Sequence, residues 1–140
     1  MTDTPHAAAI AGHPLHAMFS SVTSTCFVGA FLTDLAYWRS PDMQWANFSA
    51  WLLTIGLLVA VLVVIIGAFD FFGDRRIRRG ASPWFHAVGG SLLLVVEIFN
   101  ALVHSRDAYT SVVPAGLALS AAGVVLLSLT SWNSTEEERR

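Results

Sequence analysis

Charge is the first thing that this sequence has little of. Only 13% of its 140 residues are Asp, Glu, Lys or Arg, whereas 54% are hydrophobic, and the mean hydropathy is +0.58. Soluble domains carry about 25% charged residues, so this composition excludes an ordinary soluble domain. It predicts an integral membrane protein whose main partner is the lipid bilayer, and no nucleic-acid partner is expected.

Cysteine is nearly absent as well. The single cysteine, Cys26, lies inside an apolar run, which excludes disulfide scaffolds and thiolate metal clusters. The sequence also lacks a phosphate-binding glycine loop, an H-E-x-x-H zinc motif and a G-x-S-x-G nucleophile motif. These absences leave the protein without an assigned enzyme class.

Four long apolar runs are what the sequence does have. Each is bounded by proline, glycine or short polar residues, as helix ends usually are. The runs predict an all-α fold, an integral membrane four-helix bundle that forms a single domain over residues 1–140. The expected spans are residues 15–38, 46–72, 84–104 and 113–132.

The loop between the second and third expected spans holds the only dense basic cluster, Arg75, Arg76, Arg78 and Arg79. Loops rich in arginine and lysine stay on the cytoplasmic side of a membrane. We therefore expect this loop to face the cytoplasm, and an even number of spans then places both termini there too.

Three of the five histidines are predicted to converge at one depth on that cytoplasmic side, His13 and His16 at the start of the first span and His86 at the start of the third. Two histidines from facing helices can supply both axial ligands of a b-type haem. Gly89 and Gly90 follow His86 by about one turn and would leave room for a flat porphyrin.

This pattern predicts haem b near the cytoplasmic face, with His16 and His86 as axial ligands of the iron. His13 would orient a ligand or contact a propionate, and Asp70 would accept a hydrogen bond from an imidazole N–H. The expected function is one-electron transfer with a quinol or a partner redox protein.

Two other functions remain open for these residues. In a metal-binding or transport protein, copper or zinc would be bound by His13, His16 and His86 together with Asp70 or Asp74. In a structural or assembly subunit without a cofactor, the histidines would instead lie at the membrane interface.

A second polar pattern runs along the spans. His86 and His104 are eighteen residues apart, which is five full helical turns at about 100° per residue, and Glu97 and Asn100 lie close to the same face. The first span repeats this spacing, with Asp34 at its outer end. Polar groups are costly in hydrocarbon, so both stripes are expected to turn inward, towards each other.

The outer part of this pattern, Asp34, Glu97, Asn100 and His104, suits a proton relay or the passage of a small solute. His104 itself is expected at the membrane interface, because the outer side has no second histidine to pair with it.

Small residues inside the spans predict where helices approach closely. Gly56 and Gly67 in the second span, and Gly116 and Gly123 in the fourth, are interpreted as close-packing or dimerisation positions, and Ser49 as a helix-packing residue. A homo-oligomer is therefore among the expected assemblies.

The runs "GHPLHAMF", "TDLAYW", "WLLTIGLL", "GAFD" and "FHAVGG" resemble the bacterial four-helix membrane proteins of domain of unknown function 2231, over about residues 12–130. The resemblance carries over to His13, His16, Asp34, Asp70 and His86. It implies a protein of the bacterial inner membrane that does redox work beside a cytochrome or Rieske-type partner. The chain departs from the family after Trp132, where "NSTEEERR" replaces the glycine pair and histidine with which members often continue.

Overall fold

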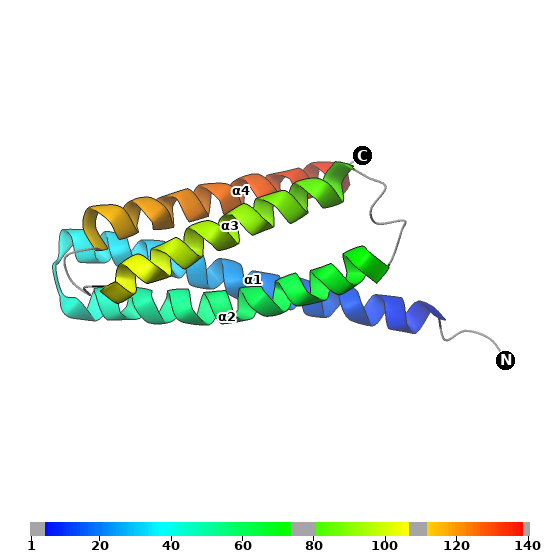
Figure 1. The fold of residues 1–140 in the computed structure, drawn as a ribbon, viewed down its shortest axis with the longest axis horizontal. Helices are drawn as coiled ribbons and strands as arrows, with labels where there is room; N and C mark the ends of the chain where they lie inside the picture. The colour runs from blue at the N-terminus through cyan, green and yellow to red at the C-terminus, as the bar shows by residue number, and fades with distance from the viewer. Residues whose placement is uncertain (1–4, 74–80, 107–111, 139–140) are drawn as a thin grey trace.

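The fold is a bundle of four long helices (Figure 1). The computed structural model describes residues 5–73, 81–106 and 112–138. Its helices are α1 (Pro5–Arg39), α2 (Met43–Gly73), α3 (Ala81–Arg106) and α4 (Leu117–Glu138), and a short kinked segment, η2 (Val112–Gly116), leads into α4. The described residues contain no strand, so the prediction of an all-α four-helix membrane bundle is confirmed.

All four helices are long and apolar enough to cross a membrane. The stretches that meet this condition are Leu15–Arg39, Met43–Phe69, Trp84–Arg106 and Val112–Trp132, close to the spans expected from the sequence. Large apolar side chains cover the outside of the bundle, among them Leu58, Phe99 and Leu129. Such a surface suits contact with lipid, and helices satisfy their own backbone hydrogen bonds there.

Local sequence explains where the helices begin and end. Asp42 caps α2, because its carboxylate accepts a hydrogen bond from the backbone N–H of Gln44 at 2.9 Å. Val113 leaves the helical conformation, with φ −122° and ψ 124°. It precedes Pro114, whose ring disfavours helical geometry in the residue before it, so the helix is interrupted at this point.

The helices pack as two antiparallel pairs, α1 with α2 and α3 with α4, and α1 also contacts α4 while α2 contacts α3. As a result, α1 and α3 face each other diagonally across the bundle. We call the end of the bundle where α1 meets α2 the Arg39 end, and the opposite end the His16 end. In Figure 1 the two pairs lie further apart at the His16 end.

The middle of the bundle is apolar and closely packed. Its buried core consists of Phe27, Ala30, Leu53, Ala60 and Leu93. Gly56 allows α1 and α2 to approach here, because a Cβ at this position would lie 2.7 Å from Cε1 of Phe27. The interpretation of Gly56 as a close-packing position is confirmed.

Candidate functional site

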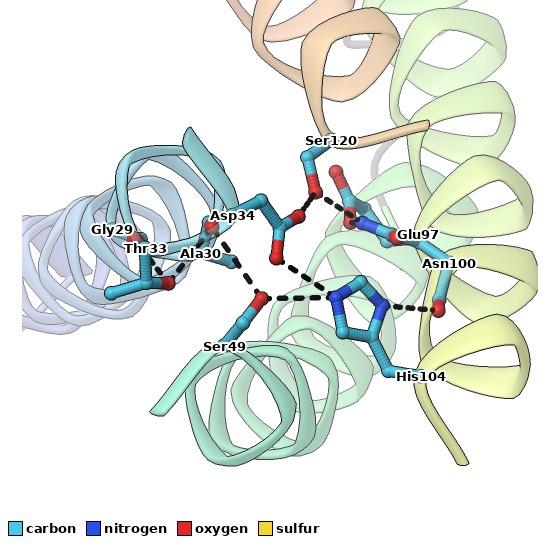
Figure 2. A network of polar contacts seen from close by, with 9 residues as sticks. All are labelled: Gly29, Ala30, Thr33, Asp34, Ser49, Glu97, Asn100, His104 and Ser120. Carbon is cyan, nitrogen blue, oxygen red and sulfur yellow. Dashed lines mark hydrogen bonds and ion pairs between the residues drawn. The ribbon is translucent and has the colours of Figure 1, made fainter. Parts of the chain in front are cut away.

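Six polar side chains meet between the helices in the Arg39 half of the bundle (Figure 2). All six are at most 4% exposed. Every helix contributes to this polar cluster, which consists of Asp34 from α1, Ser49 from α2, Glu97, Asn100 and His104 from α3, and Ser120 from α4.

Four of these residues form a closed ring of hydrogen bonds. His104 Nε2 lies 2.9 Å from Asp34 Oδ1, which joins the two diagonal helices, and His104 Nδ1 lies 2.9 Å from the backbone oxygen of Asn100. Ser120 Oγ donates to Asp34 Oδ2 at 2.5 Å. The side-chain N–H of Asn100 donates to Ser120 Oγ at 2.8 Å and completes the ring.

The hydrogen-bond partners indicate where the protons in the ring lie. A backbone carbonyl only accepts, so His104 Nδ1 donates to Asn100. Ser49 Oγ donates to the backbone oxygen of Ala30 at 3.4 Å and accepts from His104 Nε2 at 3.2 Å. All these contacts are satisfied together when the imidazole carries both protons and Asp34 is ionised.

Glu97 extends the cluster along α3 but has fewer hydrogen bonds than Asp34. Its Oε2 accepts a hydrogen bond from the side chain of Asn100 at 3.1 Å. Its Oε1 is buried and has no hydrogen-bond partner among the residues that the structure describes. Glu97 is thus a carboxyl group enclosed in a membrane-spanning bundle with a single hydrogen bond.

Two glycines make room for the polar groups of α3. A Cβ on Gly116 would lie 2.7 Å from Cε1 of His104, and a Cβ on Gly123 would collide with Oε1 of Glu97. The two glycines are seven residues apart, as are Glu97 and His104, so antiparallel helices match them pairwise. Both glycines are close-packing positions within this chain.

The structure brings together all four residues of the outer stripe, Asp34, Glu97, Asn100 and His104. His104 lies close to the end of the span Trp84–Arg106, so its expected position at the membrane interface stays a prediction, but the assumption that it lacks a partner within the chain is wrong. Its side chain is buried because a carboxylate, rather than a second histidine, reaches it from the diagonal helix.

Two hydroxyl groups have roles that the sequence analysis does not predict. Ser49 is expected to be a packing residue, yet its hydroxyl contacts the imidazole of His104. Ser120 is not among the expected site residues, yet it links Asp34 to Asn100. The signal that points to Ser120 is its position between Gly116 and Gly123, on one face of α4.

Comparison with known protein families supplies a relationship for this chain. The model of the family described as "Predicted membrane protein (DUF2231)" matches residues 12–136. The chain belongs to the DUF2231 family. No curated protein and no solved structure matches it.

The second predicted site of this DUF2231 protein lies in the other half of the bundle. His16 on α1 and His86 on α3 are half-buried there. His16 lies against α2, with its Nε2 3.7 Å from the position of a Cβ on Gly67. Gly89 faces Thr130 of α4, whose Cγ2 would lie 2.6 Å from an added Cβ, whereas Gly90 has no atom within 4 Å of that position.

Several predicted residues of the DUF2231 protein fall outside the described part of the chain. These are the side chains of His13 and Asp70, together with Asp74 and the arginine cluster at 75–79. Among the residues that the structure describes, no group of three or more His, Cys, Asp or Glu side chains is arranged to hold a metal ion. Haem, copper and zinc binding stay predictions, as does the orientation in the membrane.

Proposed function

We propose that this protein exchanges protons within the membrane and that the polar cluster is the group that carries them. The observation that supports the proposal is the ring of Asp34, His104, Asn100 and Ser120, which links an acid and an imidazole at 2.9 Å inside a membrane-spanning bundle. Ionisable groups are expensive in hydrocarbon and mark proton or ion pathways in membrane proteins.

The arrangement suits proton movement rather than binding of a larger solute. A proton can be transferred between His104 Nε2 and Asp34 Oδ1 without movement of either helix. Ser120 both accepts and donates a hydrogen bond, so its hydroxyl can pass a proton on. All six side chains of the polar cluster are buried, which favours the smallest possible cargo.

Proton flux into liposomes tests the proposal. The purified protein is reconstituted with a pH-sensitive dye inside the vesicles, and a potassium gradient with valinomycin drives proton entry. We expect flux above that of protein-free vesicles, and its loss in Asp34→Asn. Ser91→Ala is the matched control, because the Ser91 hydroxyl is exposed and bonds only to the backbone of its own helix at 2.6 Å.

Wild-type flux equal to that of empty vesicles would reject a proton-exchange function. Full flux in a folded Asp34→Asn protein would instead reject a role for the Asp34–His104 pair in that function, since this variant lacks the acid that pairs with His104.

Haem binding is the second candidate function, for the His16 half of the bundle. His16 and His86 come from diagonal helices at the same end, and the open space beside Gly90 supports the proposal that a flat macrocycle fits next to α3. Bis-histidine haem b would pass single electrons between a quinol and a cytochrome or Rieske-type partner. A reduced-minus-oxidised visible spectrum of the purified protein, with His86→Ala beside it, decides the matter: the α-band is expected in the wild type and absent from the variant.

We also propose that the protein lies in the bacterial inner membrane with the His16 end and both termini on the cytoplasmic side. The arginine cluster at 75–79 supports this orientation through the positive-inside rule. Terminal fusions to a reporter that fluoresces only in the cytoplasm are expected to fluoresce, and a periplasmic reporter at the same position is expected to stay inactive.

A further inference from the structure

The two buried carboxyl groups of the polar cluster differ in their hydrogen bonds and in whether an opposite charge contacts them. Asp34 accepts from Ser120 and pairs with His104, which balances its charge. Glu97 accepts a single hydrogen bond, from Asn100, and its Oε1 has none. With His104 already paired, an ionised Glu97 would leave a net negative charge in the bundle, and unpaired buried charge is strongly unfavourable.

We propose that Glu97 is the acid that takes up and releases the transported proton, while Asp34 and His104 stay paired. This inference rests on the proposed proton-exchange function and assigns it to one residue. The titratable groups of the polar cluster that face Glu97 are Asp34 from α1 and His104 from its own helix. Helices α2 and α4 contribute only the uncharged Ser49 and Ser120.

Thr23 indicates the direction in which Glu97 exchanges its proton. Hydroxyl groups in membrane helices commonly bond to the backbone of the preceding turn, and four others on α1 do so: Ser21, Ser24, Thr25 and Thr33. Thr23 does not, although its hydroxyl is buried, and it has no other hydrogen-bond partner within the described ranges. Its hydroxyl is therefore available in the bundle interior.

Helix geometry places Thr23 on the route from Glu97 to the His16 end. At 1.5 Å per residue, Glu97 lies about 10 Å from His104 along α3, and Thr23 lies about 16 Å from Asp34 along α1. Both displacements point towards the His16 end, and both residues are within about 20° of the face that carries the Asp34–His104 pair. Asn100 Oδ1 is a third buried oxygen without a partner in this region.

The exchange step is a simple proton transfer. The O–H bond of the Glu97 carboxylic acid breaks, a new O–H bond forms on a water molecule, and Glu97 becomes a carboxylate. The water is held by buried oxygens such as Thr23 Oγ1, because buried polar groups without protein partners bind ordered water. Reprotonation reverses the step, and no electrons are transferred.

Infrared spectroscopy and flux together test the assignment to Glu97. The wild-type protein is expected to show the carbonyl band of a protonated carboxylic acid that shifts in D₂O and is lost in Glu97→Gln. Flux is expected to fall to the level of protein-free vesicles in Glu97→Gln and to be partly retained in Glu97→Asp. The ¹⁵N signals of His104 are expected to stay unchanged in Glu97→Gln, because the Asp34–His104 pair is intact.

Thr23→Val supplies a variant of nearly the same shape that leaves both acids in place. It is expected to slow the flux and to leave the infrared band unchanged. Full flux in Glu97→Gln with loss of flux in Asp34→Asn would overturn the assignment and leave proton exchange standing. A carboxylic band that is absent from the wild-type protein, or that remains in Glu97→Gln, would also overturn the assignment to Glu97. Wild-type flux equal to that of protein-free vesicles would reject proton exchange itself.

Discussion

The two halves of the bundle hold similar polar residues in different surroundings. In the Arg39 half, His104 is 4% exposed and meets an acid from the diagonal helix. In the His16 half, His16 and His86 are half-buried, and the helix pairs lie further apart. The imidazole is buried in the half where a carboxylate contacts it. A charged imidazole away from water needs an opposite charge beside it.

The difference also involves glycine. Gly116 and Gly123 bring α4 against the polar groups of α3 in the Arg39 half. Near the His16 end, Gly90 meets no neighbouring atom within 4 Å of an added Cβ. Gly90 therefore leaves free space beside α3, whereas its neighbour Gly89 packs against Thr130 as closely as Gly116 packs against His104.

The largest expected effect comes from removing the acid of the buried pair. Asp34→Ala leaves His104 without its partner, and breaking one side of a buried pair costs about 3–5 kcal/mol. His16→Ala changes a half-buried residue and is expected to cost far less. Thermal unfolding in detergent measures both, and equal losses would mean that the two halves do not differ in the way described.

A smaller effect is expected from filling the space next to His104. Gly116→Ala would force the imidazole or α4 to move, and overpacking of this kind costs about 1–3 kcal/mol. Gly90→Ala is the matched control, because its Cβ meets nothing and alanine is the better helix former. If Gly90→Ala is as unstable as Gly116→Ala in the same unfolding measurement, the two glycines do not differ in how closely they are packed.

The smallest expected effect belongs to a single hydroxyl group. Ser49→Ala removes the contact with His104 Nε2 but leaves the Asp34 bond in place, so we expect a loss of about 1 kcal/mol. Ser91→Ala on α3 is expected to be neutral, since its hydroxyl is exposed. Chemical denaturation of the two variants side by side gives the difference, and no difference would show that Ser49 serves only to pack α2.

Much of the candidate site follows from spacing along single helices. The spacing of eighteen residues between His86 and His104 predicts that Glu97, Asn100 and His104 share one face of α3. This prediction is possible because helical periodicity is a local property. The ring itself was not predicted. A hydroxyl in a helix usually bonds to its own backbone, so nothing local distinguishes Ser49 from the other serines. Ser120 is marked only by its position between Gly116 and Gly123 on one face of α4.

By itself, the sequence determined the class of protein, the number of helices and the polar faces of α1 and α3, because composition and periodicity act within one helix at a time. The sequence also predicts that the polar faces of these two helices turn towards each other, but only the tertiary structure decided the register that brings Asp34 to His104. The tertiary structure also decided that α4 presents glycines to Glu97 and His104. These features depend on the register between helices, which arises from packing many side chains together and is not encoded in any single span.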